Sequence, residues 1–393
     1  MDSPRGRLFF MRALADGRIE PSHTVKKHIN LCLACRSCET ACPSGVVYHS
    51  LLETAQQLLT EKVPASFFER FVRSLLLRKI FPYKKRLRFM FRLLWLYQRS
   101  GIQKLIRAAR LIKLFSKQLE MAERFLPRIV NFCQIRSSRA LKDSQKPVAG
   151  LLRGCITDYF APEINRATLN LIEACGYSVF IPDAQHCCGA VHLHNQEFSL
   201  ARNCARSIIT IFEMEPVDYI ITNTAGCGAM MKEYKNLLAD DAEYGEKAKQ
   251  FSAKVRDITE FLVDYKEKLP LRALEKCIVY DDPCHLIHGQ KIQTQPRELL
   301  SAVPGLTIRH LVEADICCGS GGTFNVTQPE LSLQVLKRKM NYIRQSRADI
   351  VVTANIGCII QLKRGTELEK MPLEVSHIVN ILDEALIANN KND

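Results

Sequence analysis

The chain has 393 residues, of which 47% are hydrophobic, and a formal net charge of +14. This composition is typical of folded globular proteins and excludes a fibrous or disordered chain. No run of about 18 uncharged apolar residues occurs, so we expect no transmembrane helix. The N-terminus also lacks the apolar core of a secretory signal. We therefore expect a cytoplasmic protein, in which 16 cysteines indicate metal ligation rather than disulfides.

Residues 1–60 predict a helical, ferredoxin-type segment. Apolar residues recur with helical periodicity over residues 4–16, and a polar helix is expected over residues 22–31. A further helix is expected over residues 48–59, after Pro43. Between these helices, four cysteines follow one another at the spacing C-x2-C-x2-C-x3-C: Cys32, Cys35, Cys38 and Cys42.

This run of cysteines predicts a [4Fe-4S] site. Zinc sites usually separate two cysteine pairs by a dozen or more residues, so a zinc knuckle is the weaker alternative. Iron–sulfur runs of this spacing end in proline, and in two-cluster ferredoxins the fourth cysteine ligates the other cluster. Residues 1–31 contain no cysteine, however. Either Cys42 completes a single cluster, or the natural protein begins upstream and Cys42 serves a second one.

Residues 61–146 form a basic helical region. Within it, residues 61–142 contain 21 Lys and Arg but only 4 Asp and Glu. Helical patterns break at Pro82 and near Gly101, and residues 137–147 read as a polar linker. Three interpretations remain open: contact with an anionic membrane surface, contact with a partner subunit, or a solvated basic face over an ordinary core. Nucleic-acid binding is not expected, because no nucleic-acid-binding module is present.

Residues 147–393 contain an internal repeat of two lobes, the first at 147–270 and the second at 271–393. Three short apolar runs alternate with helices in each lobe, which predicts parallel sheets. The cysteines recur at offsets of 129 to 131 residues, and each copy contains one Cys-Cys-Gly. We predict a mixed α+β and α/β fold: a helical ferredoxin-like segment, a basic helical middle, and two repeated α/β lobes related by a pseudo-twofold axis.

Each lobe is predicted to hold a metal site, because its cysteines follow predicted strands whose carboxyl ends share one crevice. The alternative is pairs of buried apolar cysteines. The predicted ligands are Cys155, Cys187, Cys188 and Cys227 in the first lobe, and Cys284, Cys317, Cys318 and Cys358 in the second. The other cysteines are expected to be small buried hydrophobes: Cys133, Cys175, Cys204 and Cys277. Four histidines are expected to donate hydrogen bonds to cluster sulfur or to support the fold, and metal ligation or proton transfer is the alternative: His192, His194, His285 and His288.

These motifs together resemble the iron–sulfur subunit of bacterial glycolate oxidase. The similar stretches are "DSPRGRLFFM", "HINLCLACRSCETACPSGVVYH", "CCGAVHLHN", "TNTAGCGAM" and "YDDPCHLIHGQ". Related subunits of the same cysteine–cysteine–glycine repeat superfamily serve lactate utilisation, anaerobic glycerol-3-phosphate dehydrogenase and heterodisulfide reductase. Family members carry a first cysteine run upstream, which suggests a truncated N-terminus here. Some also carry a cysteine where this chain has Thr224 and Asn355, which argues against heterodisulfide chemistry.

The resemblance implies an electron-transfer subunit of a multi-subunit oxidoreductase. Its cofactors would be 4Fe-4S clusters, one at the ferredoxin-type run, a second involving Cys42 if the chain is complete, and a further one in the lobes. Flavoprotein subunits with FAD would oxidise glycolate to glyoxylate, and this chain would pass the electrons towards membrane quinone from the inner face of the cytoplasmic membrane. The alternatives are a lactate or glycerol-3-phosphate dehydrogenase subunit, or a heterodisulfide-reductase-like catalytic subunit. No residue is identified as catalytic.

Overall fold

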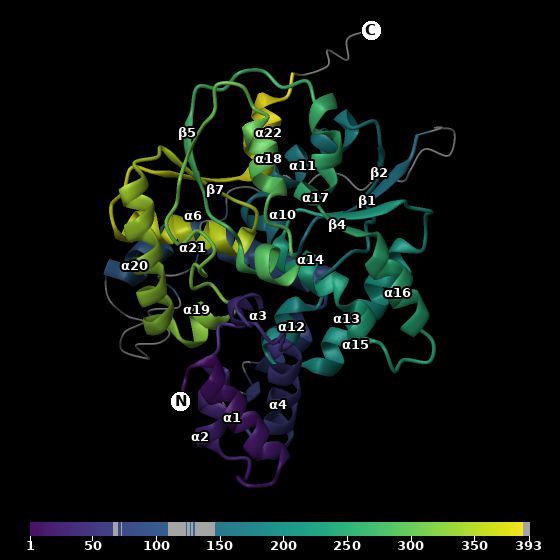
Figure 1. Ribbon diagram of the computed structural model, residues 1–393, viewed down its shortest axis with the longest axis vertical. Coiled ribbons are helices and arrows are strands. Elements are labelled where there is room, and N and C mark those ends of the chain that lie inside the picture. Colours follow the sequence, from purple (N-terminus) through teal and green to yellow (C-terminus); the bar gives the residue numbers. More distant parts are fainter. Residues whose placement is uncertain are drawn as a thin grey trace.

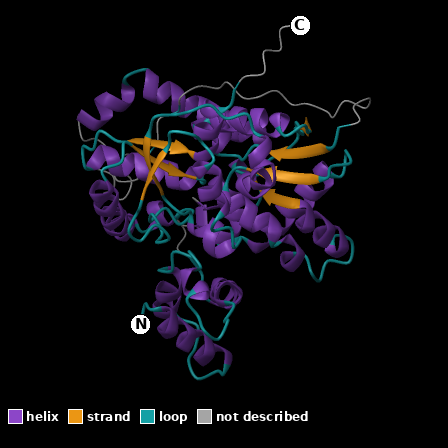
Figure 2. Ribbon diagram, turned by 45° about the horizontal axis from the view of Figure 1, so that its top comes forward, coloured by secondary structure: helices purple, strands orange, loops and turns teal. Residues whose placement is uncertain are grey.

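The computed structural model describes residues 1–65, 70, 71, 73–108, 123, 126, 129 and 146–387. A narrow helical N-terminal part projects from a broad body that contains both lobes (Figure 1). The strands of this body fall into two separate groups, each surrounded by helices (Figure 2). In the described part of the chain, no helix is both long and apolar enough to cross a membrane.

The N-terminal part is a small helical unit with its own core. Its helices are α1 (Pro4–Ala15), α2 (His23–Asn30), α3 (Ser37–Thr40) and α4 (Tyr48–Lys62). The side chains of Ser3 and Ser22 accept hydrogen bonds from backbone amides and so cap α1 and α2. Buried Ile29, Leu52 and Leu59 pack between the helices. The helices predicted over residues 4–16, 22–31 and 48–59 are therefore confirmed.

The basic region continues as η1 (Ser74–Ile80), α6 (Lys84–Arg99) and α7 (Ile102–Ala108). Pro82 lies in the break before α6, and Gly101, with a φ of +82°, separates α6 from α7. Both predicted breaks are confirmed, whereas most of the basic region after residue 108 and nearly all of the polar linker lie outside the described residues. Helix α6 packs against the first lobe, since the ring of Phe91 stacks on that of Tyr159 with centroids 4.4 Å apart.

Each lobe contains a four-stranded parallel sheet. The strands are β1 (Val148–Leu152), β2 (Ser178–Phe180), β3 (Tyr219–Thr222) and β4 (Val255–Asp257) in the first lobe, and β5 (Cys277–Tyr280), β6 (Thr307–Arg309), β7 (Ile350–Thr353) and β8 (Glu374–His377) in the second. The strand orders correspond, β2-β1-β3-β4 and β6-β5-β7-β8. The predicted parallel sheets are confirmed, and the pseudo-twofold axis stays a prediction. The sequence did not predict β4 and β8, because both are short and rich in polar residues.

Helices cover both sheets. The first lobe has α10 (Thr157–Phe160), α11 (Pro162–Ala174), α12 (Ala190–His194), α13 (Phe198–Phe212), α14 (Ala225–Lys232), α15 (Tyr234–Leu237), α16 (Gly245–Lys254), α17 (Ile258–Leu262) and η2 (Val263–Lys268). The second has η3 (His285–Gly289), α18 (Gln295–Ser301), α19 (Phe324–Thr327), α20 (Pro329–Ser346), α21 (Ile356–Leu368) and α22 (Ile378–Ala385).

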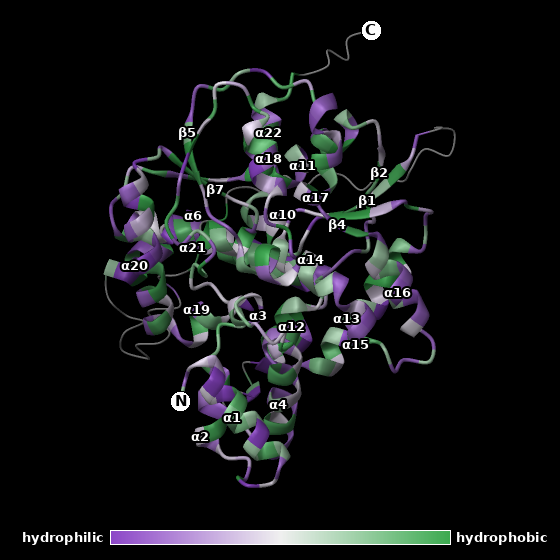
Figure 3. Ribbon diagram, viewed as in Figure 1, coloured by the Kyte–Doolittle hydropathy of each residue, from purple (hydrophilic) through white to green (hydrophobic). Residues whose placement is uncertain are grey.

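The two lobes share one continuous hydrophobic core. Buried Leu171 of α11 and Leu382 of α22 belong to the same cluster, and hydrophobic residues gather along these inner helices in Figure 3. The sheets also meet near their carboxyl ends, where the amide of Ala225 donates to the carbonyl of Ala354 over 3.4 Å. Residues that follow β3 and β7 therefore lie on opposite sides of one seam.

Candidate functional site

Four thiols of the first lobe come together at the carboxyl end of its sheet. Cys155 follows β1, the pair Cys187 and Cys188 follows β2, and Cys227 lies in the first turn of α14, directly after β3. The thiols lie close enough to shift one another's pKa in sequence, Cys155 with Cys187, Cys187 with Cys188, and Cys188 with Cys227. Parallel strands explain this meeting, because their carboxyl ends open into a common crevice.

The second lobe repeats the arrangement. Cys284 precedes η3 after β5, Cys317 and Cys318 follow β6, and Cys358 lies in α21 after β7. Their thiols form the same series of contacts, from Cys284 to Cys317, Cys318 and Cys358. Within the described residues, no group of three or more Cys, His, Asp and Glu side chains is arranged to hold a metal ion as it stands.

The glycine of each Cys-Cys-Gly motif forms a left-handed turn. Gly189 has a φ of +94° and Gly319 a φ of +88°, conformations that favour glycine. The turn lets each glycine amide donate to the sulfur of the first cysteine, Cys187 or Cys317, over 3.4 Å in both lobes. Amide donors of this kind stabilise a negatively charged sulfur. The motif therefore forms a turn and also stabilises the thiolate of its first cysteine.

Burial makes these thiols costly to ionise without a positive partner. A hydrogen bond to Cys187 and burial raise the pKa of Cys155, whereas the hydrogen bonds from Cys155 and Cys188 lower the pKa of Cys187. In the second lobe, the hydrogen bond to Cys317 and burial raise the pKa of Cys284. Because a metal supplies the missing positive charge, the thiols would lose their protons when it binds.

A buried cation lies beside the second-lobe thiols. Lys339 of α20 pairs with Asp281 over 2.8 Å, and both side chains are only 1% exposed. Burial opposes the charge of Lys339, but Asp281 and the thiols of Cys318 and Cys358 raise its pKa. The sequence did not predict this residue, because a lysine in an amphipathic helix normally faces solvent.

The ferredoxin-type run forms a tight loop between α2 and α4. Two non-glycine residues of the loop, Ala34 and Arg36, have positive φ angles of 53° and 63°. Burial and the neighbouring thiol of Cys35 raise the pKa of Cys38 to about 11. Cys42 has different surroundings, because the backbone amides of Val46, Ser44 and Gly45 lower its pKa.

This loop packs against the second lobe. Burial, together with the nearby thiol of Cys284, raises the pKa of Cys35 to about 11. Thr40 Oγ1 lies 2.9 Å from His288 Nδ1, and Leu33 lies against Gly321, close behind Cys318. The run and the second-lobe thiols are therefore neighbours in space, although about 250 residues separate Cys35 from Cys284 in the chain.

An ionic network fixes the loop from its other side. Arg36 pairs with Glu39 at 3.1 Å and with Glu233 of the first lobe at 3.4 Å. Burial opposes the charge of Glu39, but hydrogen bonds from the side chain and backbone of His49 lower its pKa to about 2. The loop thus contacts both lobes near their seam.

The four histidines of the sequence motifs all lie near the thiols, but they make different contacts. His192 Nε2 donates to the carbonyl of Leu77 in η1 over 3.0 Å, and its Nδ1 lies 3.8 Å from the sulfur of Cys204. Burial opposes protonation, but hydrogen bonds with Cys187 and Cys204 raise the pKa of His192 to about 10. His285 Nδ1 lies 3.5 Å from the sulfur of Cys284, and burial lowers its pKa to about 3. The ring of His194 packs edge-on against that of His285, while His288 contacts the run.

The remaining cysteines differ in burial. Cys204 is buried, as predicted, but lies beside the first-lobe site through its contact with His192. Cys175 and Cys277 are half-buried, and Arg309 Nε donates to the Cys277 sulfur over 3.2 Å. Cys133 lies outside the described residues.

Asn355 occupies a position where some related subunits carry a cysteine. Its side-chain amide donates to the sulfur of Cys358 over 3.4 Å. At the matching position of the first lobe, the hydroxyl of Thr224 lies 3.3 Å from that of Thr157. The two lobes therefore differ at this position, and a hydrogen-bond donor to sulfur is present in the second.

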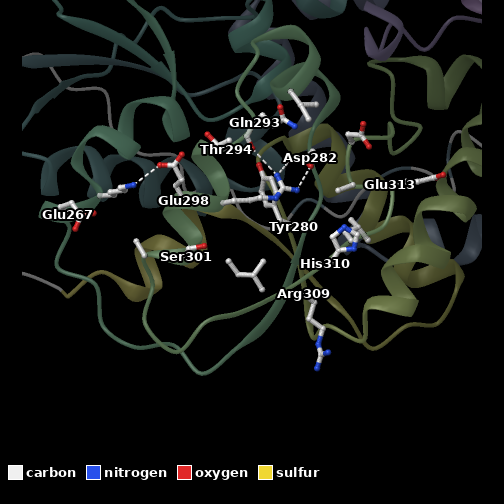
Figure 4. Close-up of a pocket in the computed structure, with 18 residues that line it drawn as sticks. Glu267, Tyr280, Asp282, Gln293, Thr294, Glu298, Ser301, Arg309, His310 and Glu313 are labelled. Carbon is white, nitrogen blue, oxygen red and sulfur yellow. Dashed lines mark hydrogen bonds and ion pairs between the residues drawn. The ribbon is translucent and has the colours of Figure 1, made fainter. Parts of the chain in front are cut away.

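A cavity of about 990 Å³ lies in the second lobe, between β5, β6 and α18 (Figure 4). Arg297 lines it and forms two hydrogen bonds of 2.7 Å with the carboxylate of Asp282. Asp282 and Asp315 line the cavity and stand two residues before Cys284 and Cys317. None of the cysteines that the structure describes lines it, so this cavity is separate from the thiol sites.

The donor sets fit iron–sulfur clusters. Each lobe offers four neighbouring thiols with an amide donor to sulfur, and the second adds a buried cation and Asn355. The run offers Cys32, Cys35 and Cys38, whose charges influence one another. Thiolate sulfur is the ligand of such clusters, and hydrogen bonds to sulfur tune their potentials.

Comparison with known proteins agrees with this chemistry. Residues 68–126 match the family "Glycolate oxidase iron-sulfur subunit, linker region", and residues 149–232 and 278–363 each match the "Cysteine-rich domain". The chain is 37% identical over 390 residues to the "Probable glycolate oxidase iron-sulfur subunit" of Bacillus subtilis strain 168. It is 32% identical over 401 residues to the "Glycolate oxidase iron-sulfur subunit" of Escherichia coli strain K12. In both cases the match covers 98% of this chain and 88% of the relative.

A more distant relative matches less of the chain. "Lactate utilization protein A" of an Exiguobacterium species is 31% identical over 246 residues, which cover 61% of this chain and 98% of the relative. The two subunits named for glycolate oxidase, in contrast, match across the N-terminal part, the basic region and both lobes. The chain belongs to the family of glycolate oxidase iron–sulfur subunits, within the cysteine–cysteine–glycine repeat superfamily.

Proposed function

We propose that this chain transfers electrons within a glycolate oxidase complex, from flavoprotein subunits that oxidise glycolate to glyoxylate towards membrane quinone. The observation that carries the proposal is the grouping of cysteines into a run and two four-thiol sets, with Cys35 of the run beside Cys284. Iron–sulfur clusters bound there supply one-electron transfer, and the two-electron oxidation of glycolate belongs to FAD on the partner subunits.

The residues of this chain hold and tune the clusters. We assign ligation to the cysteines of the three sets: Cys32, Cys35, Cys38 and Cys42; Cys155, Cys187, Cys188 and Cys227; Cys284, Cys317, Cys318 and Cys358. The amides of Gly189 and Gly319 donate to sulfur, and Lys339 balances negative charge near the second-lobe set. Cys42 either completes the cluster of the run or serves another cluster.

Cluster content provides the direct test. Protein purified without oxygen should be brown and contain iron and acid-labile sulfide in about equal amounts. Replacing Cys35 by serine should remove one signal from the electron paramagnetic resonance spectrum of the reduced protein, whereas the matched change of half-buried Cys175 should leave the spectrum unchanged. Stoichiometric zinc without sulfide would overturn the proposal.

The substrate is the second part of the proposal. The two relatives that match along nearly the whole chain are named for glycolate oxidase, which favours glycolate over lactate or glycerol 3-phosphate. Thr224 and Asn355 stand where a heterodisulfide-reductase-like subunit would carry cysteines, which disfavours that chemistry. Reduction of the clusters by glycolate, but not by lactate or glycerol 3-phosphate, in the presence of the flavoprotein subunits would support the assignment. Equal reduction by lactate would contradict it.

A further inference from the structure

The solvent-facing side of α6 carries a strip of large apolar side chains. Phe89, Leu93 and Leu96 are 63%, 53% and 58% exposed. They stand at positions i, i+4 and i+7, so they lie along one line of the helix. The buried side of α6, with Leu87 and Phe91, already packs on the first lobe, so this strip is additional to the packing face.

A strip of basic side chains runs beside the apolar one. It consists of Lys85, Arg88, Arg92 and Arg99, all exposed. Residues 70–108 contain 12 Lys and Arg and no Asp or Glu. Some of these cations are used internally, since Lys84 pairs with Asp183, and Arg73 and Arg78 pair with Glu197. Within the described residues, by contrast, no carboxylate pairs with the four cations of the strip.

The same helix covers the first-lobe thiols. Lys84 and Leu87 of α6, with Phe81 from the turn before it, line a small cavity together with Cys155 and Cys187. The preceding helix η1 joins this cover, because the carbonyl of Leu77 accepts the hydrogen bond from His192. The side chains that pack on the thiol site and those that face solvent therefore belong to opposite sides of one helix.

We infer that the exposed face of α6 binds an anionic lipid surface and holds the first-lobe cysteine set beside it. The apolar strip would enter the interface between headgroups and acyl chains, and the basic strip would meet lipid phosphates. The inference deepens the proposed function, because quinone dissolves in the membrane and the electron-carrying site must approach it.

The composition of the face favours lipid over a protein partner. Helices that lie in a membrane interface combine Lys and Arg on one side with Phe, Leu and Trp on the other, as α6 does. Residues 70–108 contain no acidic side chain that an anionic surface would repel. Each Lys or Arg near an anionic lipid surface adds to the attraction, so this segment suits such a surface. A flavoprotein subunit docked on the same face is the competing outcome of the test.

The first experiment measures sedimentation of the cluster-containing protein with vesicles. Binding is expected to vesicles of phosphatidylglycerol and phosphatidylcholine but not to phosphatidylcholine alone, and high salt should release the protein. The triple variant Lys85→Glu, Arg88→Glu, Arg92→Glu should bind at least roughly tenfold more weakly. Its matched control, with exposed residues of the second lobe changed in the same way, should bind normally: Lys337→Glu, Lys363→Glu, Lys370→Glu.

The apolar strip is tested separately. Phe89→Ser with Leu93→Ser should weaken binding to anionic vesicles and make the remaining binding more sensitive to salt. Leu331→Ser with Leu368→Ser, which changes exposed apolar residues of the second lobe, should have no effect. If the wild type does not sediment, or the triple variant sediments equally well, the inference is wrong. If these variants lose binding to the flavoprotein subunits but bind lipid as the wild type does, the face is a subunit interface and the inference is also wrong.

The second experiment tests which site lies near the lipid. A gadolinium chelate anchored to the vesicle surface shortens the spin relaxation of nearby paramagnetic centres. The signal that Cys155→Ser removes should be affected more strongly than the signal that Cys284→Ser removes. Equal effects would refute the placement. Failure of the proposed function would look different, because iron, sulfide and electron transfer to a water-soluble dye would then be missing whatever the lipid result.

Discussion

Substituting Gly319 by alanine tests how far the second Cys-Cys-Gly motif depends on its glycine. The φ angle of Gly319 is +88°, and an added Cβ would come within 2.7 Å of the carbonyl oxygen of Ser332 in α20. Gly176, in the turn after α11, has the same φ of +88° but nothing within 4 Å of an added Cβ. Comparing the two alanine variants therefore separates the loss of stability caused by the left-handed backbone from the loss caused by the clash with Ser332.

The expected magnitudes follow from these two terms. A left-handed conformation costs a residue other than glycine about 1–2 kcal/mol. Forcing an atom into a packed site adds about 1–3 kcal/mol. We therefore expect Gly176→Ala to lower the free energy of unfolding by about 1–2 kcal/mol, and Gly319→Ala to lower it by about 2–5 kcal/mol.

Urea unfolding without oxygen, followed by circular dichroism, measures both variants against the wild type. Gly319→Ala should also lose iron more readily to a chelator, because shifting the turn moves the amide that donates to Cys317. If Gly319→Ala is no less stable than Gly176→Ala and retains its iron equally well, the clash does not matter and the argument from the turn is refuted.

Three further changes test the packing and the charges. Lys339→Met should cost about 3–5 kcal/mol of stability because it leaves Asp281 buried and unpaired, and adding Asp281→Leu should restore most of the loss in urea unfolding. Leu87→Ala, at a buried position, should lower the free energy of unfolding by about 2–5 kcal/mol. Leu93→Ala, at an exposed position, should change it by less than about 0.5 kcal/mol. Equal effects would contradict the packing of α6 on the first lobe. Burial raises the pKa of Asp257 from 3.8 to about 6. The stability that the protonated Asp257 carboxyl contributes should therefore be fully present below pH 3.8 and lost as the pH rises through about 6. Asp257→Asn should remove this part of the pH dependence of unfolding.

The sequence predicted the elements whose local signals are strong. The first three strands of each sheet are apolar runs between helices, and the N-terminal helices have serine caps. β4 and β8 were missed because a strand of three or four residues that includes Arg, Asp or Glu carries no apolar pattern. These edge strands form because they pair with β3 and β7, and such pairing between distant segments leaves no local pattern in the sequence.

The grouping of thiols within each lobe could be expected, because parallel strands bring their carboxyl ends together. The contacts between parts of the chain could not. The approach of Cys35 to Cys284, the hydrogen bond from His192 to Leu77 and the burial of Lys339 all depend on how separate segments pack. A pattern of spacing describes the neighbours of a residue in the chain, and these partners lie far away in it.

The packing gives the two repeats different neighbours, and this difference suggests an order for the sites. The run lies beside the second-lobe set through Cys35 and Cys284, whereas α6 covers the first-lobe set at Cys155. The helices that carry Cys227 and Cys358 begin on opposite sides of the seam where Ala225 meets Ala354. Electrons passing from the run towards α6 would therefore meet the second lobe before the first, in the reverse of chain order.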